Sequence, residues 1–373
     1  MEKSSVEQNN YDITPIYDAH IHTYVSRPLD ETVWFIKNAM KHFNHKKIMY
    51  NALPTYNISD NWVAFYCKAN IPDTYVNAGF CHPKNCDDAD YFYNQVKAYY
   101  EMGCDGIKMI EGKPDSRKEL GLELDCEAYC RAYKYMEDNG IPLLIHVNDP
   151  KPFWDIKSAS EIAIKNGWVY GDSFPSYEKI RSEAERIADK FPDLKIVFAH
   201  FFFVSDDLEY ADKFLSKHKN VCFDITPGTE MFSEFDKNYK RSREFFIKYS
   251  DRILYGTDMD NSQKQGEMFE QSSSWAVNLV RPFLEGDQPF TYSCLNIKYN
   301  HPLALGKEEL DNIYRNNFVR IFGEKPRALD KDRIVSGIKE YMSVNASKYF
   351  IKPEPTAVDV ENIIKITEEF RNH

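Results

Sequence analysis

Two histidines, His20 and His22, stand one residue apart just after the short apolar run at 16–19. Side chains two residues apart on a strand point to the same side, so both imidazoles are expected to face one space. Imidazole is a common ligand of zinc and other first-row metals. Such a pair arises often by chance, so a metal site needs further ligands from elsewhere in the chain.

Four more polar residues lie at or near the carboxyl ends of predicted strands. His146 ends the run at 142–146, His200 follows 195–199, Asp258 follows 253–257, and Lys108 lies inside 106–110. If these runs are parallel strands of one closed sheet, their carboxyl ends meet on one face. The polar residues would then converge with the histidine pair.

The elements that must position these residues alternate along the chain. Short apolar runs are separated by amphipathic stretches with helical periodicity, an order that predicts parallel strands joined by helical crossovers. The runs lie at 16–19, 47–51, 75–80, 106–110, 142–147, 195–199, 221–225 and 253–257, and the main helices are expected at 31–42, 90–102, 126–139, 177–191, 208–218 and 242–249.

Eight such strands predict a (β/α)₈ barrel of the TIM type. The competing architecture is a doubly wound open sheet. The barrel is favoured because no glycine-rich phosphate-binding turn follows the first strand and because the polar residues end widely separated strands.

At this point the chain resembles a known family. The stretches at 17–22, 252–258 and 314–323 are similar to segments of the amidohydrolase superfamily, in the branch called amidohydrolase family 2, and the likeness runs from about residue 16 to residue 323. The resemblance implies a (β/α)₈ barrel. It also implies an activity among hydrolases, lactonases and nonoxidative decarboxylases.

The resemblance implies a role for each polar residue. His20, His22, His146 and Asp258 would bind one divalent ion, most often zinc with manganese as the alternative, and leave a position for water or substrate. Asp258 would act as the base that takes a proton from the attacking water. His200 would polarise the scissile carbonyl, or bind a second metal ion.

Lys108 bears on whether one or two ions bind. In some superfamily members a lysine on the fourth strand is carboxylated and bridges two metals. Glu111 is another candidate for binding a second ion or the substrate. Lys108 and Glu111 are three residues apart, so on a regular strand they cannot both point into the barrel. We expect one ion, with a second left open.

Other residues near the strand ends are candidates for substrate binding. Asp224 flanks the run at 221–225, and Phe153 lies just past His146, where it is expected to form an aromatic wall with Trp154. The principal candidates are His82, Asn148, Trp154 and Glu230.

Composition narrows the class of partner and compartment. The net charge of −11 argues against nucleic acid or an anionic membrane as the main partner. No signal peptide or membrane-spanning segment is apparent, and the eight cysteines show no paired zinc-binding spacing. We therefore expect a cytoplasmic protein with reduced thiols that acts on a small molecule.

Three parts of the chain are expected. Residues 1–14 read as a flexible tail, 15–325 as the barrel, and 326–373 as a helical extension with helices at 331–341 and 357–370. The extension is expected to pack on the barrel or on a neighbouring subunit of a homo-oligomer. The aromatic-rich stretch at 261–295 is expected to wall or cover the mouth of the site.

The leading function is a metal-dependent hydrolase that uses metal-activated water to cleave an amide, lactone or ester of a small molecule. The first alternative is a nonoxidative decarboxylase, which needs a cation or polar clamp for the substrate carboxylate. Lys108, Arg281 and His82 are the candidates for that clamp. The second alternative is a barrel that binds a ligand without turnover, for which a degenerate ligand set is expected.

Overall fold

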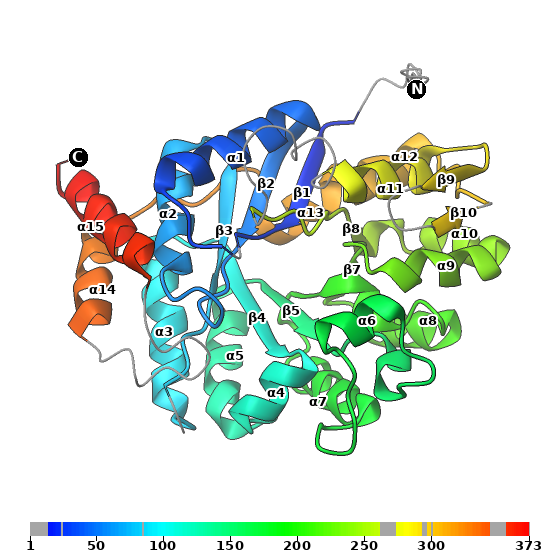
Figure 1. Cartoon of the computed structure of the whole chain (residues 1–373), viewed down its shortest axis with the longest axis horizontal. Helices are drawn as coiled ribbons and strands as arrows, with labels where there is room; N and C mark the ends of the chain where they lie inside the picture. The colour runs from blue at the N-terminus through cyan, green and yellow to red at the C-terminus, as the bar shows by residue number, and fades with distance from the viewer. Residues whose placement is uncertain are drawn as a thin grey trace.

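The structure is a computed structural model that describes residues 14–23, 25–83, 86–261, 274–292, 297–299, 301–343 and 356–372. Eight parallel strands form one sheet in the order β1 to β8, with helices around them (Figure 1), as the sequence predicts. The strands are β1 (Ile16–Ile21), β2 (His45–Asn51), β3 (Thr74–Gly79), β4 (Gly106–Gly112), β5 (Leu143–Val147), β6 (Ile196–Phe198), β7 (Val221–Asp224) and β8 (Ile253–Leu254).

The segment that follows β8 closes the sheet onto β1. The backbone N–H of Asp258 donates to the carbonyl of His20 at 2.8 Å, and the N–H of His22 donates to the carbonyl of Met259 at 2.8 Å. The fold is therefore a (β/α)₈ barrel. The closure also places Asp258 directly beside the two histidines of β1.

A buried carboxylate strengthens this closure. Asp18 Oδ2 accepts a hydrogen bond from the hydroxyl of Thr257 at 2.6 Å, and its Oδ1 accepts from the backbone N–H of His20 at 3.0 Å. Burial raises the pKa of Asp18 to about 7, although the hydrogen bonds from Thr257 and His20 oppose the shift. Asp18 thus ties the strand that carries the histidines to the segment that carries Asp258.

The inside of the barrel is an apolar core that is closed at one end by a helix. Helix α13 (Asn317–Phe322) presents Phe318 to Tyr17 and Tyr75, with ring centroids 5.5 and 4.9 Å apart in edge-on geometry. Tyr17 lies at the start of β1 and Tyr75 at the start of β3. Helix α13 therefore seals the amino-terminal end, so the open end of the barrel is the one where the strands finish.

The surrounding helices begin and end near the positions expected from the sequence. Ser176 caps α7 (Tyr177–Lys190) by accepting from the N–H of Lys179, and Gly140, with φ of 64°, ends α5 (Glu127–Asn139). The helices before the extension are α1 (Leu29–His42), α2 (Asp60–Asn70), α3 (Ala89–Met102), α4 (Pro114–Leu120), α5 (Glu127–Asn139), α6 (Glu161–Asn166), α7 (Tyr177–Lys190), α8 (Leu208–Lys217), α9 (Thr229–Lys237), α10 (Tyr239–Lys248), α11 (Ser274–Glu285) and α12 (Lys307–Asp311).

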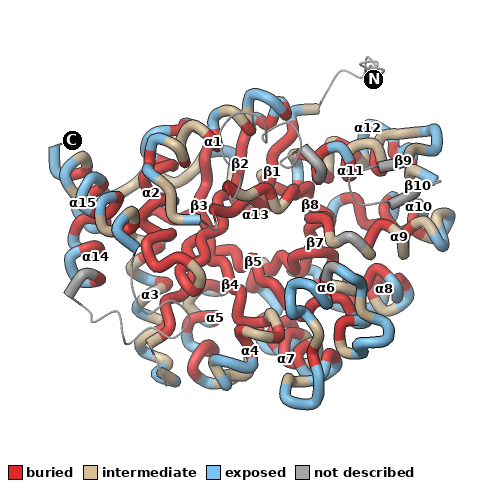
Figure 2. Tube along the Cα trace, viewed as in Figure 1, coloured by how far each residue is buried: buried red, intermediate tan, exposed pale blue. Residues whose placement is uncertain are grey.

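Burial follows this layering. The barrel strands are buried except at Lys46 of β2, whereas most of the surrounding helices expose their outer faces (Figure 2). Helix α2 is the exception, because its residues 60–68 are all buried. Two short strands, β9 (Phe290–Tyr292) and β10 (Ile297–Tyr299), pair antiparallel outside the barrel. No helix in the described ranges is both long and apolar enough to cross a membrane.

The carboxyl-terminal helices α14 (Lys331–Ser343) and α15 (Ala357–Arg371) pack beside α2 and α3 (Figure 1). Asp359, in the first turn of α15, accepts hydrogen bonds from Ser59 at 2.6 Å and from Ser26 at 2.7 Å. Ser26 belongs to the loop after β1 and Ser59 to the loop after β2. The extension therefore anchors two loops at the open end of the barrel. The proposed tail at 1–14 lies, except for Thr14, outside the described residues.

Candidate metal centre

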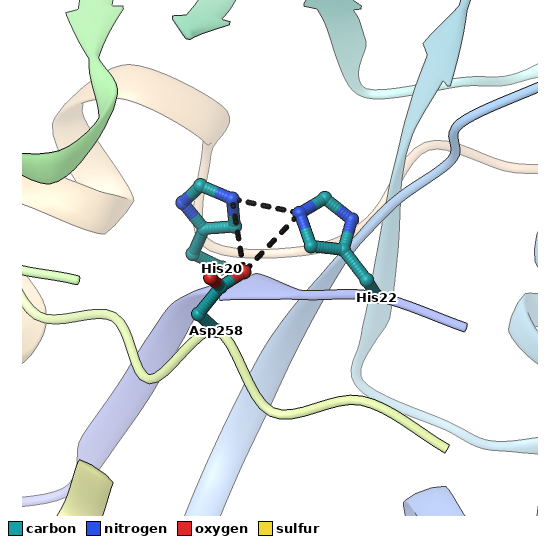
Figure 3. A group of neighbouring side chains, drawn as sticks. All are labelled: His20, His22 and Asp258. Carbon is teal, nitrogen blue, oxygen red and sulfur yellow. Dashed lines mark hydrogen bonds and ion pairs between the residues drawn. The ribbon is translucent and has the colours of Figure 1, made fainter. Parts of the chain in front are cut away.

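Three side chains converge at the open end of the barrel. His20 comes from β1, His22 follows it directly, and Asp258 follows β8 (Figure 3). Nε2 of His20 lies 2.9 Å from Nε2 of His22, and Oδ1 of Asp258 lies 3.8 and 3.4 Å from these two nitrogens. The period of two on β1 and the closure of the barrel together produce this cluster.

Hydrogen bonds at the far side of each ring decide which nitrogen carries a proton. Nδ1 of His20 lies 2.7 Å from Oδ2 of Asp224, and Nδ1 of His22 lies 2.6 Å from the backbone carbonyl of Asn51. Both partners can only accept, so both Nδ1 atoms carry the hydrogen. The two Nε2 atoms then carry lone pairs that face each other.

Three electron-rich atoms therefore point into one small space, and they repel one another unless a cation lies among them. Burial, with Lys108 adding to it, holds the pKa of His20 well below its usual range, and burial does the same for His22. Neutral imidazoles with available lone pairs are the form that binds metals. Ligand atoms around a tetrahedral zinc ion lie about 3.4 Å apart, so the three observed separations fit a divalent ion.

The backbone and carboxylate of Asp258 are arranged for this role. Its φ is 55°, in the left-handed region that costs a non-glycine residue about 1–2 kcal/mol. Oδ1 is buried and has no hydrogen-bond partner within the described ranges, although the side chain as a whole is 25 % exposed. Burial raises the pKa of Asp258 to about 8, while the positive charge of Lys108 opposes the shift. Strain and an orphaned oxygen at one residue are typical of a functional site.

His200 lies next to His20 but approaches from a different kind of element. It follows β6 in a short turn (Ala199–Phe203) in which residues 200–203 all have left-handed φ values between 51° and 58°. The N–H of His200 donates to Oδ1 of Asp224 at 2.8 Å, and its ring lies 5.5 Å from that of His20. Asp224 therefore orders both histidines.

His146, at the end of β5, is not brought within the group of three. Its ring lies 4.9 Å from that of His200, and Phe203 packs against both rings. Nε2 of His146 lies 3.4 Å from Oδ1 of Asp149, whose carboxylate is paired with Lys113. His146 thus stands at the edge of the cluster, with Nε2 buried and lacking a hydrogen-bond partner among the described residues.

Lys108 of β4 reaches directly into the cluster. Its Nζ donates to Nε2 of His20 at 3.1 Å, and its side chain is almost completely buried. Burial lowers the pKa of Lys108 to about 8, and the charges of Asp224, Asp258 and Glu111 limit the shift. Lys108 is therefore the cation that meets the converging lone pairs in this structure.

Glu111 also becomes buried, although its parity differs from that of Lys108. The pairing of β4 with β5 is irregular between Met109 and Gly112, so a strict alternation does not hold there. Glu111 Oε1 lies 3.4 Å from Nε2 of His82, and burial raises the pKa of Glu111 to about 8. Glu111 belongs to a buried group with His82 at the ends of β3 and β4.

The remaining candidates for substrate binding are spread around the rim. His82 lies 3.0 Å from the hydroxyl of Tyr129. Asn148 donates to the carbonyl of Tyr177 at 3.1 Å, and its Oδ1 is buried with no partner in the described structure. Glu230 lies half-buried in the first turn of α9.

Two further expectations concern the segments after β5 and β8. Trp154 donates from Nε1 to the carbonyl of Pro175 at 3.0 Å and packs on Tyr170, while Phe153 is buried in the same small cluster. The aromatic-rich stretch at 261–295 is only partly described, because 262–273 and 293–295 lie outside the described residues. Its helix α11 packs Phe283 against Phe235, 5.6 Å away.

Sequence reasoning missed the residues that orient the ligands. Asp224 was considered only as a substrate contact, yet it ends β7 and its position after an apolar run is the same signal that identified the histidines. The carbonyl of Asn51 carries no side-chain signal. The side chain of Asn51 is held by two hydrogen bonds. Its Nδ2 donates to the carbonyl of Ala19 at 3.1 Å, and its Oδ1 accepts from Nδ2 of Asn77 at 2.8 Å.

Comparison with known proteins bears on the family and the fold of the chain. A family model described as Amidohydrolase matches residues 51–323 of the chain. The chain belongs to this family. No curated protein sequence matches the chain.

Solved structures with the same barrel confirm the fold of this family member. A 2,6-dihydroxybenzoate decarboxylase from Rhizobium is 14 % identical with a TM-score of 0.51, covering 83 % of this chain and 99 % of that one. A zinc-bound amidohydrolase from Burkholderia multivorans is 8 % identical with a TM-score of 0.50 and the same coverage of 83 % and 99 %. A dihydroxybenzoic acid decarboxylase from Polaromonas sp. JS666, with manganese and 2-nitroresorcinol, is 13 % identical with a TM-score of 0.51, covering 83 % and 97 %.

Proposed function

We propose that this amidohydrolase-family chain is a metal-dependent hydrolase that cleaves a C–N or C–O bond of a small amide, lactone or ester. The observation that carries the proposal is the convergence of Nε2 of His20, Nε2 of His22 and Oδ1 of Asp258. A polar cluster of this kind needs a cation, and it lies at the end of the barrel where catalytic residues of this fold are found.

The proposed ligands are His20, His22 and Asp258, with His146 as the fourth. They are expected to hold one divalent ion, zinc or manganese, since nitrogen and carboxylate ligands suit both. A divalent ion in such a site lowers the pKa of the water it binds to about 7. One ion is sufficient for this chemistry.

The side chains supply the proton transfers. Asp258 takes the proton of the attacking water and passes it to the leaving nitrogen or oxygen. His200, in the turn after β6, orients the scissile carbonyl. Its Nδ1 lies 3.2 Å from the carbonyl of Thr226, which leaves Nε2 to face the substrate. Asp224 keeps His20 and His200 in place during these steps.

A decarboxylase of a small carboxylic acid is the second candidate, and the position of Lys108 favours it. A buried cation beside the metal ligands would hold the carboxylate that leaves as carbon dioxide. The same residues serve both reactions, and a fold shared with known decarboxylases does not determine the chemistry. A ligand-binding barrel without turnover is disfavoured because three of the four proposed ligands, His20, His22 and Asp258, converge in the described structure.

One experiment separates the two reactions. Purified protein is incubated with a panel of small lactones, amides, esters and aromatic or unsaturated carboxylic acids, with carbon dioxide and newly formed acid groups measured in parallel. We expect acid formation without carbon dioxide, abolished in Asp258→Asn. Release of carbon dioxide without acid formation would contradict the hydrolase and establish the decarboxylase.

A further inference from the structure

Lys108 differs from the other cations near the open end of the barrel. Its side chain is only about 1 % exposed, and no carboxylate oxygen in the described part of the chain lies within 4.0 Å of its Nζ. Among the described residues, its one hydrogen bond is to Nε2 of His20, at 3.1 Å. A buried ammonium group normally pairs with a carboxylate, because an unpaired buried charge is strongly unfavourable.

The other candidates for an anion clamp are already engaged or uncharged. Arg281 donates two hydrogen bonds to Glu285, at 2.8 and 3.1 Å. Burial lowers the pKa of His82 to about 3, so its ring is neutral at physiological pH. Of the three candidates, Lys108 is the one that is both charged and adjacent to the proposed ligands.

The acids around Lys108 are also committed to other partners. Asp224 uses Oδ2 for His20 and Oδ1 for the N–H groups of His200 and Thr226. Asp258 is proposed to bind the metal ion. Glu111 turns its Oε1 toward His82. These carboxylates favour the charged form of Lys108 from a distance without pairing with it.

The hydrogen bond of Lys108 and the proposed metal ion compete for one lone pair. Because Nδ1 of His20 is committed to Asp224, Nε2 is the only nitrogen of His20 that can bind a metal. That nitrogen is also the one to which Lys108 donates. Once the ion is bound, Lys108 becomes a buried cation without an acceptor, directly beside the place where substrate binds.

We propose that Lys108 binds an anionic group of the substrate, and that the substrate is therefore a small molecule carrying a carboxylate next to the reacting bond. The inference rests on the proposed metal site. In the hydrolase, the carboxylate bound by Lys108 is a recognition group that survives the reaction. In the decarboxylase it is the group that is lost.

The test uses the metal-loaded full chain and two small probes, acetate and its neutral analogue acetamide. Their affinities are measured by NMR titration of the histidine ring signals in the wild type, in Lys108→Met, and in the control Lys118→Met, which removes an exposed lysine on α4. The metal content of each protein is measured by elemental analysis. Lys108→Gln provides a second neutral variant should Lys108→Met fail to fold.

We expect acetate affinity to fall at least tenfold in Lys108→Met, with acetamide affinity, metal content and the Lys118→Met control unchanged. Equal acetate affinity in wild type and Lys108→Met would overturn the inference, as would a wild type that does not bind acetate. Loss of metal from Lys108→Met would also overturn it, by making Lys108 part of the metal site. Absence of metal from the wild type would instead refute the proposed function.

Discussion

Oδ2 of Asp224 lies 2.7 Å from Nδ1 of His20, and both side chains are completely buried. Because the carboxylate can only accept, it fixes the proton of His20 on Nδ1 and leaves the Nε2 lone pair facing His22 and Asp258. The other oxygen of Asp224 accepts the N–H of His200. One carboxylate from β7 therefore sets the orientation of residues on β1 and after β6.

Replacement of Asp224 by asparagine should weaken metal binding. The amide can donate to Nδ1 and shift the proton of His20 to Nε2, and losing such a partner typically costs 10–100-fold in metal affinity. The affinity is measured by calorimetric titration of the apo protein with zinc, beside Asp251→Asn, an exposed aspartate, as the control. Unchanged zinc affinity in Asp224→Asn would show that the carboxylate does not position His20.

Replacement of Asp258 by asparagine should remove most turnover. Asparagine keeps an oxygen ligand at the site but cannot take up a proton, and general bases contribute about 10²–10⁴-fold to rates. We expect kcat to fall at least about 100-fold while elemental analysis still detects metal. A rate equal to that of the wild type would place the base elsewhere, most plainly at His200.

Asp60 should make the free energy of unfolding depend on pH. It is buried and accepts from Thr23, Tyr50 and the N–H of Leu53 at 2.7, 2.5 and 2.7 Å. Burial raises its pKa from 3.8 to about 6, with the hydrogen bonds limiting the shift. The folded state therefore holds this proton more tightly than the unfolded state. The resulting stabilisation is complete below about pH 4 and is lost as pH rises through about 6.

The check is urea unfolding of wild type and Asp60→Asn at pH 4, 5, 6 and 7. The free energy of unfolding of the wild type relative to Asp60→Asn should fall by about 2–3 kcal/mol between pH 4 and pH 7. Glu119→Gln, at an exposed position, should show no such trend. A difference between wild type and Asp60→Asn that does not change with pH would refute the assignment.

Asp359 should stabilise the fold from the carboxyl-terminal helix. It accepts from Ser26 and Ser59 and completes a capping box with Thr356. Loss of a cap and of buried hydrogen bonds typically costs about 1–3 kcal/mol, so Asp359→Ala should lower the thermal unfolding midpoint clearly more than Glu361→Ala, an exposed neighbour. Equal midpoints for the two variants would mean that α15 does not anchor the loops.

Much of the fold follows from local pattern. The apolar runs that became β1 to β8 are short, β-branched and separated by amphipathic helices, so their identity needs no knowledge of distant contacts. The length of β6 was harder to predict. His200 was expected directly after a strand, and it instead begins a turn in which residues 200–203 all have left-handed φ values. Three of these residues are phenylalanines, a residue type that gives no sequence signal for that conformation. Packing of these rings against β7 and α10 selects that conformation.

The site was predictable where it depends on strand parity and barrel closure. His20, His22 and Asp258 meet because residues two apart share a face and because β8 returns to β1. The position of the His146 ring, by contrast, depends on its pairing with Asp149. Glu111 does not follow the alternation expected of a regular strand, because the pairing of β4 with β5 is irregular between Met109 and Gly112. Side-chain partners and bulges of this kind are set by neighbours far away in sequence, which periodicity cannot encode.

The central claim is that His20, His22 and Asp258 hold a divalent ion. Elemental analysis of the purified, active protein tests it most directly, with the double variant His20→Ala, His22→Ala beside His301→Ala, a histidine that is 47 % exposed and lies away from the cluster. The account predicts about one zinc or manganese ion per chain in the wild type and in His301→Ala, and none in the double variant. An active wild-type preparation without metal, or a double variant that keeps its ion, would contradict it.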